Sequence, residues 1–285
     1  MGQIGEAVRR AAAKLEAAGV ENALHDAWRL MALALDGDPL LLRLRAGDDL
    51  SAEQESAFDA LICRRAQREP LQYIEGDTEF MGIRLRVSES VLIPRQDTET
   101  LCSEALRLLD PGDRVLDIGT GSGALAIALK RLCPGAAVTA VDISPAALEV
   151  AKENACRCGA GIEFLRSDCF GGLAGRRFEM IVSNPPYLTQ EEMQTLMPEV
   201  QREPEGALFG GADGLAFYRR ITAEATQHLT PGGHLLFEIG WRQKEAVSAL
   251  LRESVGEPHA IRDLGGNWRV VWACRRAAAC GAQGD

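Results

Sequence analysis

One stretch of this chain restricts its fold more than any other. Residues 114–118 form a short apolar run, residues 119–123 read Gly-Thr-Gly-Ser-Gly, and residues 124–131 carry a helical pattern. Across this turn the spacing of the apolar residues changes from that of a strand to that of a helix. Strand and helix then alternate downstream with short links, which requires right-handed crossovers and a parallel sheet covered by helices on both faces. We therefore predict an α/β fold.

The later strands are expected where short apolar runs end in polar or turn residues. These runs occupy residues 137–141, 162–166, 178–183, 233–239 and 268–273, with a helix at residues 145–155.

Ahead of this region the chain has a helical pattern. Ile4, Val8, Ala11, Ala12 and Leu15 share one helical face. By itself a small helical domain of this kind offers no catalytic constellation, so we assign it to the docking of a substrate or partner. The predicted organisation is a helical bundle at residues 1–75, a β-hairpin linker at 76–94, the α/β domain at 95–276 and a disordered tail at 277–285.

Two local signals refine these boundaries. Residues 51–54 read Ser-Ala-Glu-Gln, the form of a capping box before a helix. Asp97 is expected to cap a second helix at residues 98–109, which leads into the α/β domain.

The charge of the chain bears on its partners. It has 31 Lys and Arg against 41 Asp and Glu, a formal net charge of -10 over 285 residues. Binding duplex phosphates requires clustered Lys and Arg, so this balance argues against a surface made to hold nucleic acid. No apolar stretch is long enough to span a bilayer, and the first 18 residues lack the apolar core of a signal peptide. We expect no membrane contact.

The cysteines indicate a compartment. There are eight, with no Cys-x-x-Cys pair, and only four histidines to complete a metal site. We interpret them as free thiols, expect no bound metal, and place the chain in the reducing cytoplasm.

The glycine turn favours a nucleoside cofactor. Asp142 ends the next strand about 20 residues past the glycines, the position from which a carboxylate accepts ribose hydroxyls. The turn is not a dinucleotide Gly-x-Gly-x-x-Gly, and no Walker lysine follows it. With Asp117 ahead of it, the turn resembles the signature of S-adenosylmethionine-dependent methyltransferases.

A second polar turn follows the strand at residues 178–183, where the chain reads Asn184, Pro185, Pro186 and Tyr187. Neither proline can donate to a sheet and each fixes φ, so the strand stops abruptly and exposes the Asn184 amide. In an open α/β sheet this carboxyl edge is where ligands bind. The tetrapeptide resembles that of amino-methyltransferases that act on a planar NH2, either the exocyclic amine of adenine or a glutamine amide.

The chemistry of such a nitrogen explains the residue types. Its lone pair is delocalised and barely nucleophilic, so it must be oriented. The Asn184 side-chain oxygen and the Pro185 carbonyl can accept its two N–H bonds and aim the lone pair at a methyl donor. Tyr187 would stack on the planar group, and water could take the proton after transfer.

Adenine and glutamine both fit this chemistry. A DNA methyltransferase must flip its base and hold the gapped duplex, which needs a recognition domain and a basic cleft. Neither is evident in the roughly one hundred residues after Tyr187, a length typical of the remainder of one domain. A cofactor-binding partner of the translation machinery without turnover is a third reading.

Several stretches in the same order together resemble the peptide chain release factor glutamine methyltransferase family. The likeness runs from about Glu69 to Trp272, and the helical region before it has the expected size and position. The stretches are residues 69–74, 92–99, 119–123, 184–187, 203–211, 213–215, 218–219 and 238–240.

The resemblance implies a Rossmann-like class I methyltransferase sheet of seven strands, the last antiparallel. It also implies methylation of the glutamine amide in the Gly-Gly-Gln motif of class 1 release factors, with S-adenosylmethionine as donor. Nothing in the sequence demands more than a monomer. Its catalytic residues would be Asn184, Pro185 and Tyr187, and its substrate-binding residues these three with Pro186. The implied cofactor-binding residues are Gly119, Thr120, Gly121, Ser122, Gly123, Asp142, Asp168, Cys169 and Asn184.

Two positions depart from the family pattern. Gln96 replaces a common proline, and Cys169 stands where an aromatic or Leu is more usual. For Arg95, Asp97 and Glu99 two readings stay open: a lip over cofactor and substrate, or a helix amino terminus with local pairing.

Overall fold

The computed structural model describes residues 2–276, so the tail predicted at 277–285 lies outside the described part. The chain forms two compact units. The first ends at Asp77 and also includes Met197–Arg202, a segment that the sequence analysis assigned to the α/β domain. The second comprises Thr78–Leu196 and the chain from Glu203 onward.

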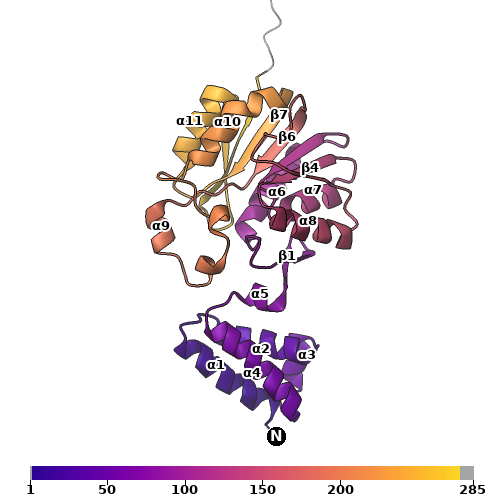
Figure 1. The fold of residues 1–285 in the computed structure, drawn as a ribbon, viewed down its shortest axis with the longest axis vertical. Helices are drawn as coiled ribbons and strands as arrows, with labels where there is room; N and C mark the ends of the chain where they lie inside the picture. The colour runs from indigo at the N-terminus through magenta and orange to yellow at the C-terminus, as the bar shows by residue number, and fades with distance from the viewer. Residues whose placement is uncertain (1, 277–285) are drawn as a thin grey trace, which may run out of the picture. The chain divides into compact units, whose positions relative to one another are not determined.

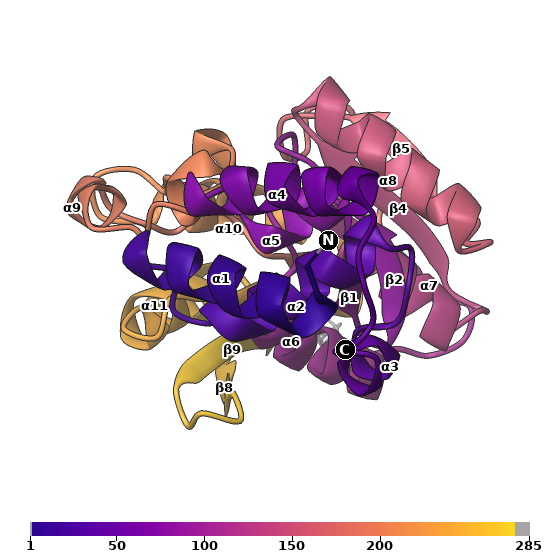
Figure 2. The same ribbon diagram turned by 90° about the horizontal axis from the view of Figure 1, so that it is seen from below.

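The first unit is helical, as predicted. The five residues expected on one face of its first helix are all buried, and the Ser51–Gln54 capping box is formed. The helices α1, α2 and α4 lie side by side around a core that includes Leu15, Leu30 and Phe58 (Figure 2). The helices are α1 (Ile4–Ala17), α2 (Ala23–Ala34), α3 (Pro39–Leu44), α4 (Ala52–Ala66) and α5 (Leu71–Glu75).

The segment Met197–Arg202 is held on this unit by ion pairs. Arg65 is buried and pairs with Asp26 at 2.9 Å and with Glu199 at 2.9 Å. Arg68 pairs with the same Glu199 at 2.5 Å, and Arg202 donates to the carbonyl of Gln67. Glu199 is thus shared by two guanidinium groups. Arg68 binds both of its oxygens, the bidentate geometry that arginine favours.

The second unit begins with a two-stranded hairpin, β1 (Asp77–Phe80) and β2 (Ile83–Arg86), followed by the helix α6 (Gln96–Leu108). The prediction that Asp97 caps this helix is wrong. Arg95 is the N-cap and makes no side-chain cap, while the Asp97 carboxylate pairs with Arg269 at 2.9 Å. The Asp97 carboxylate therefore forms a long-range ion pair and does not cap the helix.

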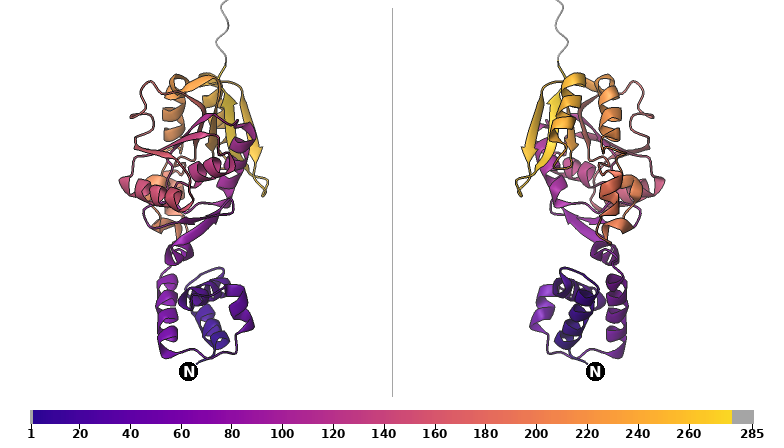
Figure 3. Two further views of the ribbon diagram at one scale, coloured as in Figure 1. Left: turned by 90° about the vertical axis from the view of Figure 1, so that its right-hand side faces the viewer. Right: turned by 90° about the vertical axis from the view of Figure 1, so that its left-hand side faces the viewer.

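A seven-stranded sheet forms the centre of the second unit (Figures 1 and 3). Its strands follow the order β5-β4-β3-β6-β7-β9-β8. Neighbouring strands from β5 to β7 are parallel, and β9 is antiparallel to both β7 and β8, as the resemblance implies. The strands are β3 (Arg114–Ile118), β4 (Ala137–Asp142), β5 (Glu163–Arg166), β6 (Phe178–Ser183), β7 (Leu229–Glu238), β8 (Pro258–Arg262) and β9 (Trp268–Cys274).

Helices cover the two faces of this sheet. Alternate strand residues enter different clusters, Val115 and Val182 on one face, Leu116 and Ile181 on the other, as the twofold repeat of a strand requires. The first face packs against α6, α7 (Ala124–Leu132) and α8 (Pro145–Arg157). The second packs against α10 (Ala216–His228) and α11 (Lys244–Ser254), while α9 (Gln190–Gln194) and the turns Val200–Arg202 and Glu205–Ala207 are short (Figure 1).

Two strands differ from expectation. β7 begins at Leu229, four residues before the predicted run, through an irregular stretch around Pro231. β8 carries Pro258 and His259 without apolar alternation and is not among the predicted runs. It lies at the edge of the sheet, where a proline is tolerated.

Candidate functional site

The two polar turns meet at the carboxyl edge of neighbouring strands. Ile118 at the end of β3 pairs with Val141 of β4 on one side and with Ser183 of β6 on the other. Gly119 and Asn184 therefore leave the sheet side by side. β3 to β5 are added in one direction and β6 in the other, so this is the switch point at which α/β sheets bind ligands.

The glycine turn is shaped by its backbone. Gly119, Gly121 and Gly123 have φ of 74°, 56° and 82°, a region that side chains rarely adopt. A Cβ added at Gly119 or Gly121 would meet no atom within 4 Å, whereas one at Gly123 would press on Ala151 at 3.1 Å. The first two glycines thus leave space open, and the third permits close packing of helices.

A buried carboxyl supports this turn from the strand. The Thr120 hydroxyl donates to Asp117 at 2.6 Å, and Asp117 is 1% exposed. Burial raises the pKa of Asp117 to about 7, an effect that nearby Asp142 adds to and the Thr120 bond opposes.

Asp142 is fixed by two backbone donors. One carboxylate oxygen accepts from Gly121 N and the other from Ser144 N, both at 2.9 Å. Each oxygen keeps a further lone pair for a ligand hydroxyl. The carboxylate is therefore oriented in advance next to the open glycines.

The turn at Asn184 is held by residues far away in sequence. Asn184 Nδ2 donates to Thr98 Oγ1 at 3.2 Å, and Gln243 Nε2 donates to the Tyr187 carbonyl at 3.0 Å. Gly210 packs so closely that an added Cβ would lie 2.6 Å from the Pro186 carbonyl oxygen. Gly210 N also donates to the carbonyl of Leu188. The prolines end the strand, but these contacts fix the turn.

A cavity of about 210 Å³ opens between the two turns. Among the residues implied by the resemblance, Gly119, Gly121, Asp142, Asp168, Cys169, Asn184, Pro185 and Pro186 line it.

Four of the implied residues do not line this cavity. Thr120 and Ser122 are buried, and Ser122 accepts a bond from Asn154 through its carbonyl. Gly123 packs on α8. The Tyr187 side chain packs against the second-face cluster, and burial raises its pKa to about 12. These residues shape the turns.

Several lining residues escaped sequence reasoning. Among them are Ser90, Val91, Leu92, Pro204, Gly206, Ala207, Phe217 and Ile221. Glu203 connects the segments at residues 90–92 and 204–207, because its carboxylate pairs with Arg95 and accepts from Ile93 N at 3.0 Å. The Glu203-Pro204 pair was a usable signal, although its partner could not be identified from the sequence.

The partners of Arg95, Asp97 and Glu99 bear on the two readings of these residues. Arg95 pairs with Glu203, Asp97 with Arg269, and Glu99 accepts from Met81 N at 2.7 Å. In the described structure none of the three lines the cavity. These contacts favour the reading as paired residues at the start of the helix, and residues 90–92 line the cavity in their place.

Cys169 follows β5 with a φ of 50°, which is unusual for a residue other than glycine. It is buried at the cavity wall, and burial raises the pKa of its thiol to about 11. The thiol is therefore protonated and unreactive at neutral pH, and it acts as a small apolar surface.

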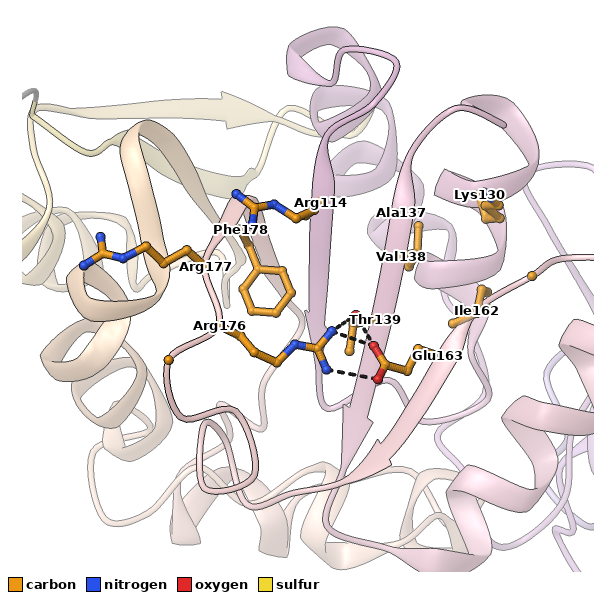
Figure 4. A pocket seen from close by; sticks show the side chains of 12 residues that line it. Arg114, Lys130, Ala137, Val138, Thr139, Ile162, Glu163, Arg176, Arg177 and Phe178 are labelled. Atoms are coloured by element: carbon orange, nitrogen blue, oxygen red, sulfur yellow. Dashed lines mark hydrogen bonds and ion pairs between the residues drawn. The ribbon is translucent and has the colours of Figure 1, made fainter.

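A wider hollow, of about 960 Å³, lies at the opposite edge, where β3 to β6 begin (Figure 4). It is lined by several cations, but Arg176 pairs with Glu163 at 2.5 Å and Arg114 pairs with Glu179 at 2.6 Å. It has neither a glycine turn nor strand carboxyl ends. We therefore place the candidate site at the other edge.

Known proteins resemble this chain along nearly its whole length. Residues 6–76 match the PrmC N-terminal domain family, and residues 98–208 match the methyltransferase small domain family. A release factor glutamine methyltransferase of Geobacter sulfurreducens is 44% identical over 89% of this chain and 90% of its own length. One of Cereibacter sphaeroides is 43% identical over 96% of this chain and 99% of its own length.

A solved structure supports the fold. The crystal structure of a methyltransferase from Pyrococcus furiosus superimposes with a TM-score of 0.57 at 20% identity, covering 76% of this chain and 99% of that one. The predicted class I methyltransferase fold is confirmed. No helix within residues 2–276 has the length and apolar character needed to cross a membrane. By its sequence and domain composition, the chain belongs to the release factor glutamine methyltransferase family.

Proposed function

We propose that this chain transfers a methyl group from S-adenosylmethionine to the side-chain amide nitrogen of the glutamine in the Gly-Gly-Gln motif of class 1 peptide chain release factors. The observation that carries the proposal is the juxtaposition of the Asn184 turn and the glycine turn across one cavity. Relatives that bear this name match the chain almost end to end.

The residues at the cavity fit the cofactor. Gly119 and Gly121 leave space that a Cβ would fill, and Asp142 has an oriented carboxylate for ribose hydroxyls. Asp168 and the apolar Cys169 would border the adenine. When bound, the cofactor supplies an electrophilic methyl group on a sulfonium sulfur.

The protein's part in the reaction is orientation. The Asn184 side-chain oxygen and the Pro185 carbonyl accept the two N–H bonds of the glutamine amide, which directs the nitrogen lone pair towards the donor. As the nitrogen gains positive character, the same two acceptors stabilise it. The proton leaves to water after transfer. Tyr187 stacking on the amide remains a prediction, since its ring packs against the second-face cluster.

The experiment is a transfer assay with labelled S-adenosylmethionine and a recombinant class 1 release factor. Label is expected in the Gly-Gly-Gln peptide, and a release factor with this glutamine replaced by alanine is the matched control. Absence of label from the unaltered factor would reject the proposal. The alternative, an adenine amino-methyltransferase acting on nucleic acid, predicts DNA or RNA binding that weakens steeply with salt.

The helical unit is proposed to dock the release factor. On α3, Leu40, Leu41 and Leu44 are 73%, 62% and 85% exposed, which gives this helix an apolar surface. Replacing Leu44 with glutamate should raise KM for the intact factor and leave KM for a short Gly-Gly-Gln peptide unchanged. Equal changes with both substrates would argue against docking. We also propose that the enzyme acts in the cytoplasm, where its release factor substrate works, and that it is a monomer.

A further inference from the structure

Next to the Asn184 turn lies a buried carboxyl group that the reaction described above does not use. Phe237 of β7 pairs with Ser183 of β6, so Glu238 follows beside Asn184 at the same edge. Glu238 is 2% exposed, and its Oε2 has no hydrogen-bond partner within the described structure. A buried acid with an unused oxygen is costly and calls for an explanation.

Thr98 connects this acid to the candidate catalytic residue. Its hydroxyl is the hydrogen-bonding neighbour of the Glu238 carboxyl that lowers the pKa of that acid, and Thr98 Oγ1 accepts from Asn184 Nδ2 at 3.2 Å. Thr98 is 6% exposed, so water does not compete freely for these bonds. The three side chains form a chain of hydrogen bonds from β7 through α6 to the turn after β6.

The direction of these bonds follows from the proton count. A threonine hydroxyl has one proton, and an ionised carboxylate can only accept. While Thr98 donates to Glu238, its oxygen can only accept from its second partner, so the nitrogen of the Asn184 amide must face it. The Asn184 oxygen then faces away from Thr98 and remains available to accept a hydrogen bond from the substrate.

We propose that Thr98 and Glu238 are positioning residues that set which end of the Asn184 amide faces the substrate. This inference rests on the proposed function, because the amide oxygen is the end that a substrate NH2 requires. If Glu238 gains a proton, it can donate a hydrogen bond to the Thr98 oxygen. The Thr98 hydroxyl is then free to donate its own hydrogen bond to the Asn184 side-chain oxygen. The amide turned in this way presents its own N–H groups to the substrate N–H groups, and binding in the reactive orientation is lost.

The surroundings of Glu238 set where this change occurs. Burial raises its pKa to about 7, while the Thr98 bond and the positive charges of Arg269 and Arg95 lower it. The groups that face it are Arg269 on β9, Asp97 and Arg95 at the start of α6, Tyr187 in the turn and Tyr218 on α10, whose hydroxyl donates to the Glu238 carbonyl. Arg269 is itself shared with Asp97 and Asp263.

Thr98→Val keeps the side-chain shape and removes the hydroxyl. We expect kcat for methylation of the release factor to fall by about 10²-fold, since misplacing a reacting group costs this much. Thr98→Ser restores the hydroxyl and should remain within about threefold of the parent. Thr222→Val is the matched control, because Thr222 is equally buried but bonds only to carbonyls of its own helix.

Glu238→Gln tests the charge at nearly constant shape. The parent kcat should fall as pH decreases through about 7, and this inflection should be absent in the variant. Glu104→Gln, a buried acid on α6 paired with Arg107, should keep the inflection. Cofactor affinity and the unfolding midpoint, measured for every variant, identify any variant that fails to fold.

The outcomes separate the two proposals. If the parent does not methylate a release factor, the proposed function fails. If the parent is active and folded Thr98→Val matches it, or Glu238→Gln keeps the inflection near pH 7, the positioning role is wrong. A pH-independent defect shared by Thr98→Val and Thr98→Ser would also overturn it, because the hydroxyl would then be irrelevant.

Discussion

The two turns at the carboxyl edge of the sheet are supported in opposite ways. The turn at residues 119–123 takes its shape from three glycines with positive φ and from Asp117, which accepts from Thr120. We call it the self-supported turn for this reason, although Asp142 also accepts from Gly121 N and Asn154 donates to the Ser122 carbonyl. The turn at Asn184 is defined by other segments, since Thr98, Gly210 and Gln243 hold it and lie 86, 26 and 59 residues from Asn184 in sequence.

This difference teaches which properties each turn controls. A turn shaped by its own glycines is affected little by substitutions elsewhere in the protein, but substitution of the glycines changes its backbone. A turn held from outside depends on several distant positions, each of which can shift the reacting amide. Substitutions near the first turn should therefore change cofactor affinity, and those near the second should change kcat.

The largest effect is expected at the reacting amide. Asn184→Ala removes one acceptor for the substrate nitrogen, and kcat should fall by about 10²–10³-fold, as for the loss of one preorganised group in other enzymes. Gln190→Ala, at an exposed position that begins α9, should leave kcat unchanged. Single-turnover methylation assays measure both, and retention of methylation by Asn184→Ala would refute the mechanism.

The next effect tests support from outside the turn. In Gly210→Ala the new Cβ would lie 2.6 Å from the Pro186 oxygen and 2.7 Å from Tyr187 Cα, so the turn must move. We expect kcat to fall by roughly 10²-fold and the free energy of unfolding to fall by about 1–3 kcal/mol. Gly161→Ala is the control, because its Cβ would meet nothing within 4 Å. Equal kcat values in the two variants would show that Gly210 does not support the Asn184 turn.

A smaller effect is expected at the self-supported turn. Gly121→Ala places a Cβ in the cavity at a φ of 56°, which costs roughly 1–2 kcal/mol. Because the same Cβ takes space next to the bound cofactor, we expect about a tenfold weaker cofactor affinity, measurable by calorimetry, with kcat at saturating cofactor close to that of the parent. A large loss of kcat with unchanged affinity would show that cofactor affinity and kcat are not controlled by separate turns.

The smallest effect concerns stability and pH. The pKa of Asp117 is raised from 3.8 to about 7 in the folded protein, so between these values the folded state binds more protons than the unfolded state. The contribution of Asp117 to the free energy of unfolding is therefore largest below about pH 4 and decreases as pH rises through 7.

Asp117→Asn removes this contribution, while the raised pKa of Glu238 keeps a similar one. Urea denaturation at pH 5 and pH 8 should thus show a smaller decrease in stability for the variant than for the parent. An identical decrease would mean that Asp117 does not titrate in this range.

The sequence allowed the fold and both turns to be predicted because each has a local signal. The switch of apolar spacing around residues 119–123 predicts the strand, turn and helix, and two consecutive prolines predict the end of β6. Asp97 was misread because a carboxylate at a helix start fits a cap, and nothing nearby in sequence indicates Arg269 as its partner. The roles of Thr98, Glu203 and Glu238 depend on pairings across the fold, which no local pattern encodes.

The position of Met197–Arg202 in the helical unit has a consequence for synthesis of the chain. Arg65 and Arg68 emerge from the ribosome well before Glu199, and the whole of Thr78–Leu196 is made in between. At about 5–20 residues per second this is a delay on the order of ten seconds, during which the two arginines lack their shared carboxylate. The helical unit is first in sequence but is completed only after most of the sheet has been translated.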